Sequence, residues 1–170
     1  FGGAISTSTQ FYKTLLGNTG IKVDVQPSTL MINDTIWTLD QSKINFSDNH
    51  LGVDNFTLKH GGQHIIINGV ASKSAGDSLI VDLQEADLEY ILDAVNFHSV
   101  KFGGYVTGRV NVKDVFTSAK ASANITVKPF LFLDNDMGVL HANAEWNDGK
   151  IDIQAIANNP PDGIMSINGY

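Results

Sequence analysis

The sequence contains no cysteine, and this absence removes two classes of protein at once. Without cysteine there is no disulfide framework and no cysteine-ligated zinc site, so redox chemistry does not identify the compartment. Charged residues are also few, at 17% of 170 residues, and the net charge is −7. That balance provides no basic stripe for phosphate groups and argues against a nucleic-acid partner. It also argues against docking on an anionic lipid surface.

Long hydrophobic runs are missing as well. No stretch approaches the roughly 20 consecutive apolar residues that span a bilayer. The first residues, Phe1-Gly2-Gly3, have neither the basic start nor the apolar segment of a signal peptide. If the intact protein is exported or anchored, we expect its signal or anchor to lie outside this segment.

Apolar and polar residues alternate with a period of two through most of the chain. Ile21, Val23 and Val25, for example, alternate with Lys22 and Asp24. Successive side chains of a strand point to opposite faces, so this pattern predicts strands with one dry and one wet face. Short polar segments separate these strands as hairpin connections do, which indicates a long antiparallel meander.

Two fold classes accommodate such a meander. All-β chains with this strand spacing are usually sandwiches or barrels. A chain that repeats can instead extend one sheet along an axis. We predict a mainly β fold consisting of one elongated, curved antiparallel sheet that forms a groove, with a β-sandwich as the alternative.

Several motifs recur about a hundred residues apart. Ile67-Asn68-Gly69 returns as Ile167-Asn168-Gly169, and Val25-Gln26-Pro27 is matched by Val127-Lys128-Pro129. Chance similarity between strands of like composition is the alternative explanation. We predict one segment, residues 1–170, of a longer repeat array. Its first repeat covers about residues 1–100, and a partial second repeat covers about 101–170.

One stretch, Asp87 to Val95, departs from the alternation and predicts a short amphipathic helix. Its apolar positions fall at helical spacing and form one face, Leu88, Ile91, Leu92 and Val95. Asp87 is the expected N-cap and Asn96 the expected stop. So short a helix is unstable alone in water, so we expect it to cap the groove between successive repeats. A second helix is predicted at Phe11 to Leu16.

The residues that most resemble functional motifs have simpler explanations. His60 and His64 have the spacing of a helical metal pair, but Gly61-Gly62 between them favours a turn with two solvated imidazoles. The segment 134–138 is similar to a calcium loop but lacks its glutamate, so a polar hairpin turn is expected. Since no catalytic cluster is recognisable, we expect a protein that is not an enzyme and that uses no metal and no cofactor.

Part of the chain resembles the TamB family of bacterial translocation and assembly module proteins, within the wider AsmA-like group of repeating β-groove (β-taco) proteins. The resemblance covers about a fifth of the chain, and this part is similar to family members from Bacteroidetes. It is carried by three motifs, Asp77-Ser78-Leu79-Ile80-Val81-Asp82-Leu83, Asp87-Leu88-Glu89-Tyr90-Ile91-Leu92-Asp93 and Phe102-Gly103-Gly104-Tyr105-Val106-Thr107-Gly108-Arg109-Val110.

The resemblance implies the periplasmic part of a cell-envelope protein that is anchored in the inner membrane outside this segment. In that family an apolar sheet face is thought to carry phospholipid acyl chains to the outer membrane, or to assist protein assembly and secretion there. The implied partners are phospholipid and an outer-membrane assembly protein of the barrel type. Open sheet edges also allow an edge-to-edge homodimer of the segment.

The strand parity predicts which residues line such a groove, although the same residues would form the core of a closed sandwich. The predicted lining is Val23, Val25, Ile44, Phe46, Phe56, Leu58, Ile65, Ile67, Ile125, Val127, Ile151, Ile153 and Ile167. Ile66 interrupts the alternation and is expected on the opposite face. The alternative function is a structural or adhesive repeat segment that binds partner proteins through its polar face.

Overall fold

The computed structural model describes residues 2–32, 34–94, 100–147, 150–159 and 163–169. Within these ranges the chain forms one helix, α1 (Leu88–Ala94), and fifteen strands. The strands that precede the helix are β1 (Gly2–Ala4), β2 (Thr7–Lys13), β3 (Thr19–Val25), β4 (Ser28–Ile32), β5 (Thr35–Leu39), β6 (Ser42–Ser47), β7 (His50–His60), β8 (Gln63–Ser72) and β9 (Ser78–Asp87). Those that follow it are β10 (Phe102–Lys113), β11 (Lys120–Phe132), β12 (Asn135–Asp136), β13 (Val139–Asn147), β14 (Lys150–Asn159) and β15 (Gly163–Gly169).

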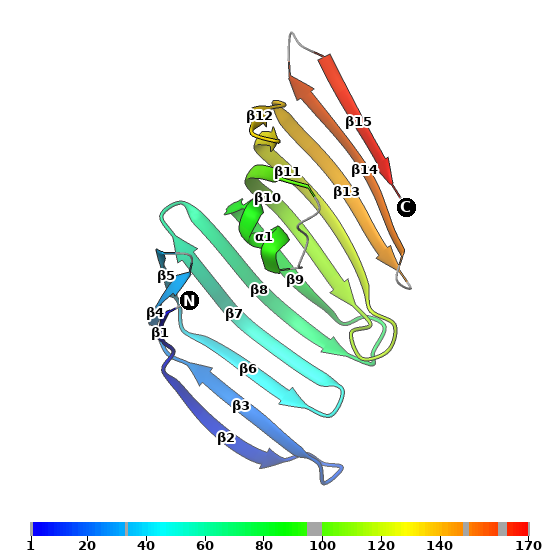
Figure 1. Cartoon of the computed structure of the whole chain (residues 1–170). Coiled ribbons are helices and arrows are strands. Elements are labelled where there is room, and N and C mark those ends of the chain that lie inside the picture. Colours follow the sequence, from blue (N-terminus) through cyan, green and yellow to red (C-terminus); the bar gives the residue numbers. More distant parts are fainter. Residues whose placement is uncertain (1, 33, 95–99, 148–149, 160–162, 170) are drawn as a thin grey trace.

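All of these strands belong to one antiparallel sheet. Its long strands lie side by side in the order β2, β3, β6, β7, β8, β9, β10, β11, β13, β14 and β15, and Figure 1 shows them as one curved sheet with open edges. The described strands do not form the two facing sheets of a sandwich. The prediction of a mainly β, elongated and curved antiparallel sheet with one short helix is therefore confirmed.

The N-terminal strands break where they leave the main sheet. β3 ends before Pro27, which has no amide hydrogen to donate to the ladder. The breaks of neighbouring strands lie side by side, because Gln26 N donates to Ser6 O at 2.9 Å and Asp40 N donates to Thr57 O at 2.9 Å. Beyond these breaks β1, β4 and β5 form a small extension of the sheet, which we call the flap.

The helix α1 begins where the sequence predicts. The Oδ1 atom of Asp87 accepts a hydrogen bond from Glu89 N at 2.9 Å, so Asp87 is the N-cap. Leu88 is buried, and Ile91 and Leu92 pack against the same apolar cluster. The last residue of the predicted face, Val95, and the predicted stop, Asn96, lie outside the described residues.

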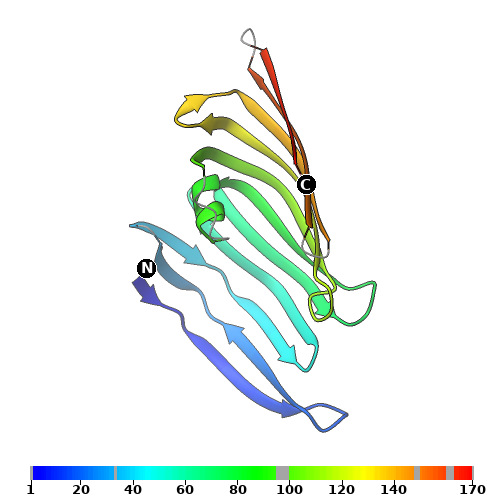
Figure 2. The ribbon, with the colours of Figure 1, turned by 45° about the vertical axis from the view of Figure 1, so that its right-hand side comes forward.

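The flap and α1 stand on the same side of the sheet, as Figure 2 shows. They touch through the rings of Trp37 in β5 and Tyr90 in α1, whose centroids are 6.4 Å apart. On its other side α1 packs over the start of β10, where Phe102 and Phe130 stack at 5.8 Å. The helix α1 therefore fills the space between the flap and the starts of the strands that follow the helix in the sequence.

The second predicted helix is wrong. Residues from Phe11 to Lys13 belong to β2, and the chain turns immediately afterwards. The cause is cross-strand pairing, since Phe11 lies opposite Ile21 and Lys13 lies opposite Thr19. A full antiparallel ladder outweighs the weak local preference of a six-residue stretch for helix.

The strand boundaries recur about one hundred residues apart. β4 ends at Ile32 and β11 ends at Phe132, one hundred residues later. β7 begins at His50 and β14 begins at Lys150, again one hundred residues later. β8 and β15 begin at equivalent positions as well. The duplication and its repeat boundaries stay a prediction.

Candidate functional site

The cross-strand register determines which side chains share a face, because directly paired residues point the same way. In the first half of the sheet Val23 lies opposite Ile44, and Ile44 lies opposite Val53. The same chain of pairs runs through all later strands and ends on β15. The register places twelve residues of the predicted lining on this one face: Val23, Val25, Ile44, Phe46, Phe56, Leu58, Ile65, Ile67, Ile125, Val127, Ile151 and Ile153. Their contact with lipid stays a prediction.

A bulge in β7 keeps this face continuous. Val53 and Phe56 are three residues apart and would point to opposite faces in a regular strand. The extra residue is accommodated at Asn55, which adopts a φ of 55° and whose amide donates to Asn68 Oδ1 at 2.6 Å. Both apolar side chains therefore lie on the same face.

A similar bulge occurs in β9. Glu85 has a φ of 48°, and its amide donates to Thr107 Oγ1 at 3.1 Å. Leu83 and Ala86 on either side of it consequently both face the apolar side, although they too are three residues apart. Non-glycine residues adopt positive φ only where the surrounding structure enforces it. These two positions thus maintain the apolar face at places where strict alternation would end it.

The register also places on the apolar face further residues that are absent from the predicted lining. They share the face with the predicted lining: Phe11, Ile21, Leu51, Val53, Val81, Leu83, Val106, Val110, Val112, Leu140, Met165 and Trp146. Most of them stand in short alternating runs like the predicted ones. The signal was therefore present for Val81, Val110 and Val112, whereas Val53 and Val106 depend on the bulges beside them.

Side-chain exposure divides the apolar face into two halves. Towards the end that carries α1, Val106 is 1% exposed in the cluster that includes Leu88 of the helix, and Leu39 of the flap is also 1% exposed. Towards the opposite end, Phe46 and Ile151 remain 48% and 49% exposed. We call these regions the covered half and the open half. Among the predicted lining, Val25 and Val127 are buried, and the side chain of Ile167 is outside the description.

Gly69 shows how tightly neighbouring strands approach at this face. It adopts a φ of 119°, and a Cβ atom built on it would collide with the carbonyl oxygen of Ser78. Only glycine satisfies both conditions. The Ile67-Asn68-Gly69 motif therefore lies where β8 comes close to the start of β9, and β8 continues beyond it to Ser72.

The opposite face is mainly polar, and several of its side chains are paired. Arg109 donates to both carboxylate oxygens of Asp82, at 2.6 and 3.0 Å, and this bond raises the pKa of the guanidinium. Ile66 lies on this side, opposite Asp82 and Thr57, as its parity predicts. A hollow of about 670 Å³ spans β8 to β11 here, lined among others by His64, Ile66 and Arg109.

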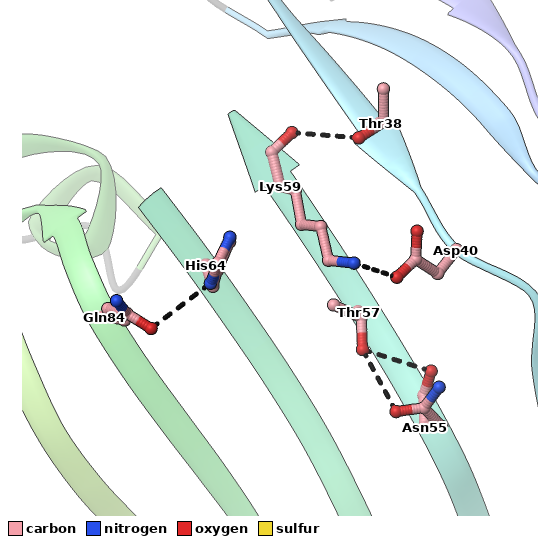
Figure 3. Close-up of polar contacts among 7 residues, drawn as sticks. All are labelled: Thr38, Asp40, Asn55, Thr57, Lys59, His64 and Gln84. Carbon is pink, nitrogen blue, oxygen red and sulfur yellow. Dashed lines mark hydrogen bonds and ion pairs between the residues drawn. The ribbon is translucent and has the colours of Figure 1, made fainter. Parts of the chain in front are cut away.

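Figure 3 shows the pairing at the junction with the flap. Lys59 forms an ion pair with Asp40, and its carbonyl accepts from Thr38 Oγ1 at 3.4 Å. The hydroxyl of Thr57 is directed at the carbonyl and amide oxygens of Asn55, at 3.4 and 3.3 Å. These contacts stabilise the β7 bulge and the attachment of β5, and they provide no acid–base pair aimed at a cavity.

The histidines singled out in the sequence occupy a hairpin. His60 and Gln63 face each other across the turn, as expected from Gly61-Gly62. His60 Nδ1 lies 2.8 Å from Ile36 O, and His64 Nδ1 lies 3.3 Å from Gln84 Oε1. Within the described ranges no group of three or more His, Cys, Asp or Glu side chains is placed to hold a metal ion.

The segment similar to a calcium loop and the glycine-rich start of β10 are also structural. Leu133 and Asp134 form a turn and Asn135–Asp136 form β12, which pairs antiparallel with β11 as the predicted hairpin. The glycine-rich stretch from Phe102 opens β10 and contains the register shift between Gly103 and Tyr105.

No helix in the described part of the chain has the length and apolarity needed to cross a membrane.

The protein therefore has the architecture of an open, curved antiparallel sheet. One face of the sheet is apolar, and α1 and the flap cover half of that face. Comparisons with known protein families, with curated proteins and with solved structures find no match to this chain. The resemblance to the TamB family stays a prediction on that account.

Proposed function

We propose that this chain is a segment of a cell-envelope β-groove protein that shields or conducts the acyl chains of phospholipids. The single observation that carries the proposal is the continuous apolar face from β2 to β15 with its open half uncovered. An apolar sheet face in water must be covered by a second sheet, a helix or another molecule. Here α1 and the flap cover one half only.

The open half has the chemistry that acyl chains require. Phe11 and Phe46 stand there at 72% and 48% exposure, and Trp146 and Ile151 continue the surface on the second repeat. Their register partners are apolar or small, so no charged group lies directly opposite them. Burying such side chains under a hydrocarbon chain is favourable by about 25 cal/mol for each Å² removed from water.

The resemblance to the TamB family supports the cellular setting of the proposal. It places the segment in the periplasm, with phospholipid as the cargo and a barrel-type assembly protein of the outer membrane as a further partner. In this proposal the chain is not an enzyme and needs no cofactor. Its work is to keep hydrocarbon out of water between two membranes.

The covered half supports one refinement. Leu88 and Phe130 are buried within the cluster that α1 closes, so acyl chains would lie on the open half and pass beside the helix. A groove that conducts lipid would therefore be narrowed at α1 rather than running at full width.

The proposal is tested by photo-crosslinking from two isoleucines of the same strand. Ile151 lies on the apolar face and Ile156 on the polar face, and their side chains are 49% and 53% exposed. A photoreactive amino acid at Ile151 is expected to capture phospholipid that co-purifies with the protein, identified by mass spectrometry, whereas the same group at Ile156 captures none. Equal lipid capture at both positions, or capture of protein only at Ile151, contradicts the proposal.

The polar face supports a second candidate, a structural or adhesive segment that binds partner proteins. The observation in its favour is the 670 Å³ hollow between β8 and β11. That candidate predicts protein crosslinks from Ile156 and no lipid at Ile151, so the same experiment separates the two.

A further inference from the structure

A second apolar surface lies at the end of the sheet away from α1. The hairpin between β2 and β3 has Leu15 and Leu16 at its tip, and both side chains stand in solvent, at 107% and 88% exposure. The turn itself is well formed, because Gly17 N donates to Thr14 O at 2.9 Å and Asn18 N donates to Thr14 Oγ1 at 3.1 Å. The backbone polar groups are thus paired while the leucines project outward.

The hairpin between β10 and β11 has the same design about one hundred residues later. Val115 and Phe116 occupy the positions of the two leucines. Its turn is closed by the equivalent bond, from Thr117 N to Asp114 O at 2.9 Å. A hairpin tip normally favours small polar residues, so an apolar pair at both tips calls for a common cause.

A half-exposed aromatic side chain accompanies each tip on the apolar face. Phe46 lies opposite Ile21, next to the first hairpin, and is 48% exposed. Trp146 lies opposite Ala121, next to the second, and is 46% exposed. We call the six side chains the hairpin rim: Leu15, Leu16, Phe46, Val115, Phe116 and Trp146.

The charges of the protein are separated along the strands. In the sequence, the hairpins at this end of the sheet carry slightly more lysines than carboxylates: Lys13, Lys73, Lys113, Lys120 and Lys150 against Asp48, Asp77, Asp114 and Asp148. Two of those carboxylates are engaged, since Asp77 accepts from Ser72 Oγ at 2.6 Å and Asp114 lies 3.5 Å from Lys120. The turns and the helix at the other end are acidic, with Asp34, Asp87, Glu89, Asp93, Asp134 and Asp136 against Lys101.

The net charge of −7 therefore belongs mainly to the end that carries α1. The net negative charge opposes binding of the acidic end to an anionic membrane surface. It does not oppose contact through the hairpin rim at the other end. Beside Trp146 a hollow of about 190 Å³ is lined by Lys113 and Lys120, which lie directly opposite each other, and by Glu145. Lys120 lies 3.5 Å from Asp114, so the ammonium group of Lys113 is the one that suits the phosphate of a lipid headgroup.

We propose that the hairpin rim rests on the surface of a phospholipid bilayer, with its apolar side chains at the boundary of headgroups and acyl chains and its lysines among the phosphates. Apolar side chains next to lysines, on a backbone whose hydrogen bonds are internally paired, are the composition of interfacial membrane contacts. This contact does not require that the groove hold lipid, so it goes beyond the proposed function.

Flotation with vesicles of phosphatidylcholine and a minor fraction of phosphatidylglycerol tests the proposal. The unaltered protein is expected to float with the vesicles. A variant with Leu15→Ser and Leu16→Ser is expected to bind about tenfold more weakly or worse, because membrane partition scales with the apolar area that leaves water. The matched control has Ile36→Ser and Leu133→Ser, which alter two side chains of 59% and 55% exposure near the acidic end. It is expected to bind like the unaltered protein.

A second measurement reports insertion directly and remains informative if a serine variant folds poorly. The chain has no cysteine, so Leu16→Cys and Leu133→Cys each accept one polarity-sensitive fluorophore. Vesicles are expected to shift the emission of the Leu16 label to the blue and to leave the Leu133 label unchanged. Raising the salt concentration is expected to weaken the binding, since lysine–phosphate attraction is screened.

Three results overturn the proposal: absence of flotation by the unaltered protein, equal losses in the rim variant and the control, or a blue shift at Leu16 without vesicles. The last result, together with a doubled mass in sedimentation, assigns the rim to contact between two copies of the chain. Lipid captured from Ile151 is measured on purified protein without vesicles, so failure of the groove and failure of the rim are distinguishable.

Discussion

Trp37 of β5 and Tyr90 of α1 meet edge to face, with ring centroids 6.4 Å apart. This contact joins the flap to the helix, two elements that lie far apart in the sequence. The indole nitrogen of Trp37 is buried without an acceptor among the described residues, so ring burial and not hydrogen bonding holds the side chain in place. The pair is one of the contacts in the covered half of the apolar face.

Replacement of Trp37 by alanine is expected to destabilise the protein by about 3–5 kcal/mol, because it opens a cavity between the flap and α1. Urea unfolding followed by circular dichroism measures the loss. The other tryptophan of the chain, Trp146, is 46% exposed and provides the control. Its replacement by alanine is expected to cost clearly less, and equal losses from the two variants would contradict the assignment of Trp37 to the core.

Loss of the cap of α1 is expected to weaken the helix. Asp87→Ala removes the acceptor for Glu89 N and should cost about 0.5–2 kcal/mol, the usual range for an N-cap. Asp87→Asn keeps an oxygen at the same place and should retain most of the stability. Hydrogen exchange of the α1 amides, measured in both variants, checks the difference. Faster exchange in the asparagine variant than in the alanine variant is the contrary result.

Gly69→Ala is expected to destabilise the sheet by more than about 1 kcal/mol, since alanine is strained at positive φ and its Cβ would strike the Ser78 carbonyl. Thermal unfolding measures the effect. Gly76 has open space around its Cα, so Gly76→Ala is the control and should change stability by no more than about 0.5 kcal/mol. A harmless Gly69→Ala variant would show that β8 and β9 do not approach as described.

Lys101 is expected to titrate above its ordinary value of 10.5, because a 2.7 Å hydrogen bond and the charge of Asp134 raise the pKa of its ammonium group. A raised pKa in the folded state means that the stabilisation is fully present below the ordinary value and is lost as pH rises through the folded-state pKa. The contribution is small, since both groups are exposed and salt screens them.

Nuclear magnetic resonance of the lysine side-chain carbons measures this titration. Asp134→Asn is expected to bring the midpoint of Lys101 back towards 10.5. A midpoint that does not respond to this substitution rules out the ion pair in solution.

Much of the fold could be predicted because its signals are local. The alternation of Ile21, Val23 and Val25 predicted a strand with one apolar face, and the register places these residues together on that face. The spacing after Asp87 predicted a capped helix and its packing face. Phe11 to Leu16 was misread because six residues contain too little periodic signal, and pairing with β3 decided their structure.

The sequence by itself determined that the chain forms hairpins with an apolar and a polar side, since strand alternation needs no knowledge of distant residues. Only the tertiary structure decided which half of the apolar side is covered. Asn55 and Glu85 adopt positive φ where side chains on neighbouring strands accept hydrogen bonds from their amides, and these bulges carry the apolar face across breaks in the alternation. Trp37 is buried because a helix encoded much later in the chain packs against it. Such contacts arise from long-range packing, which no local pattern contains.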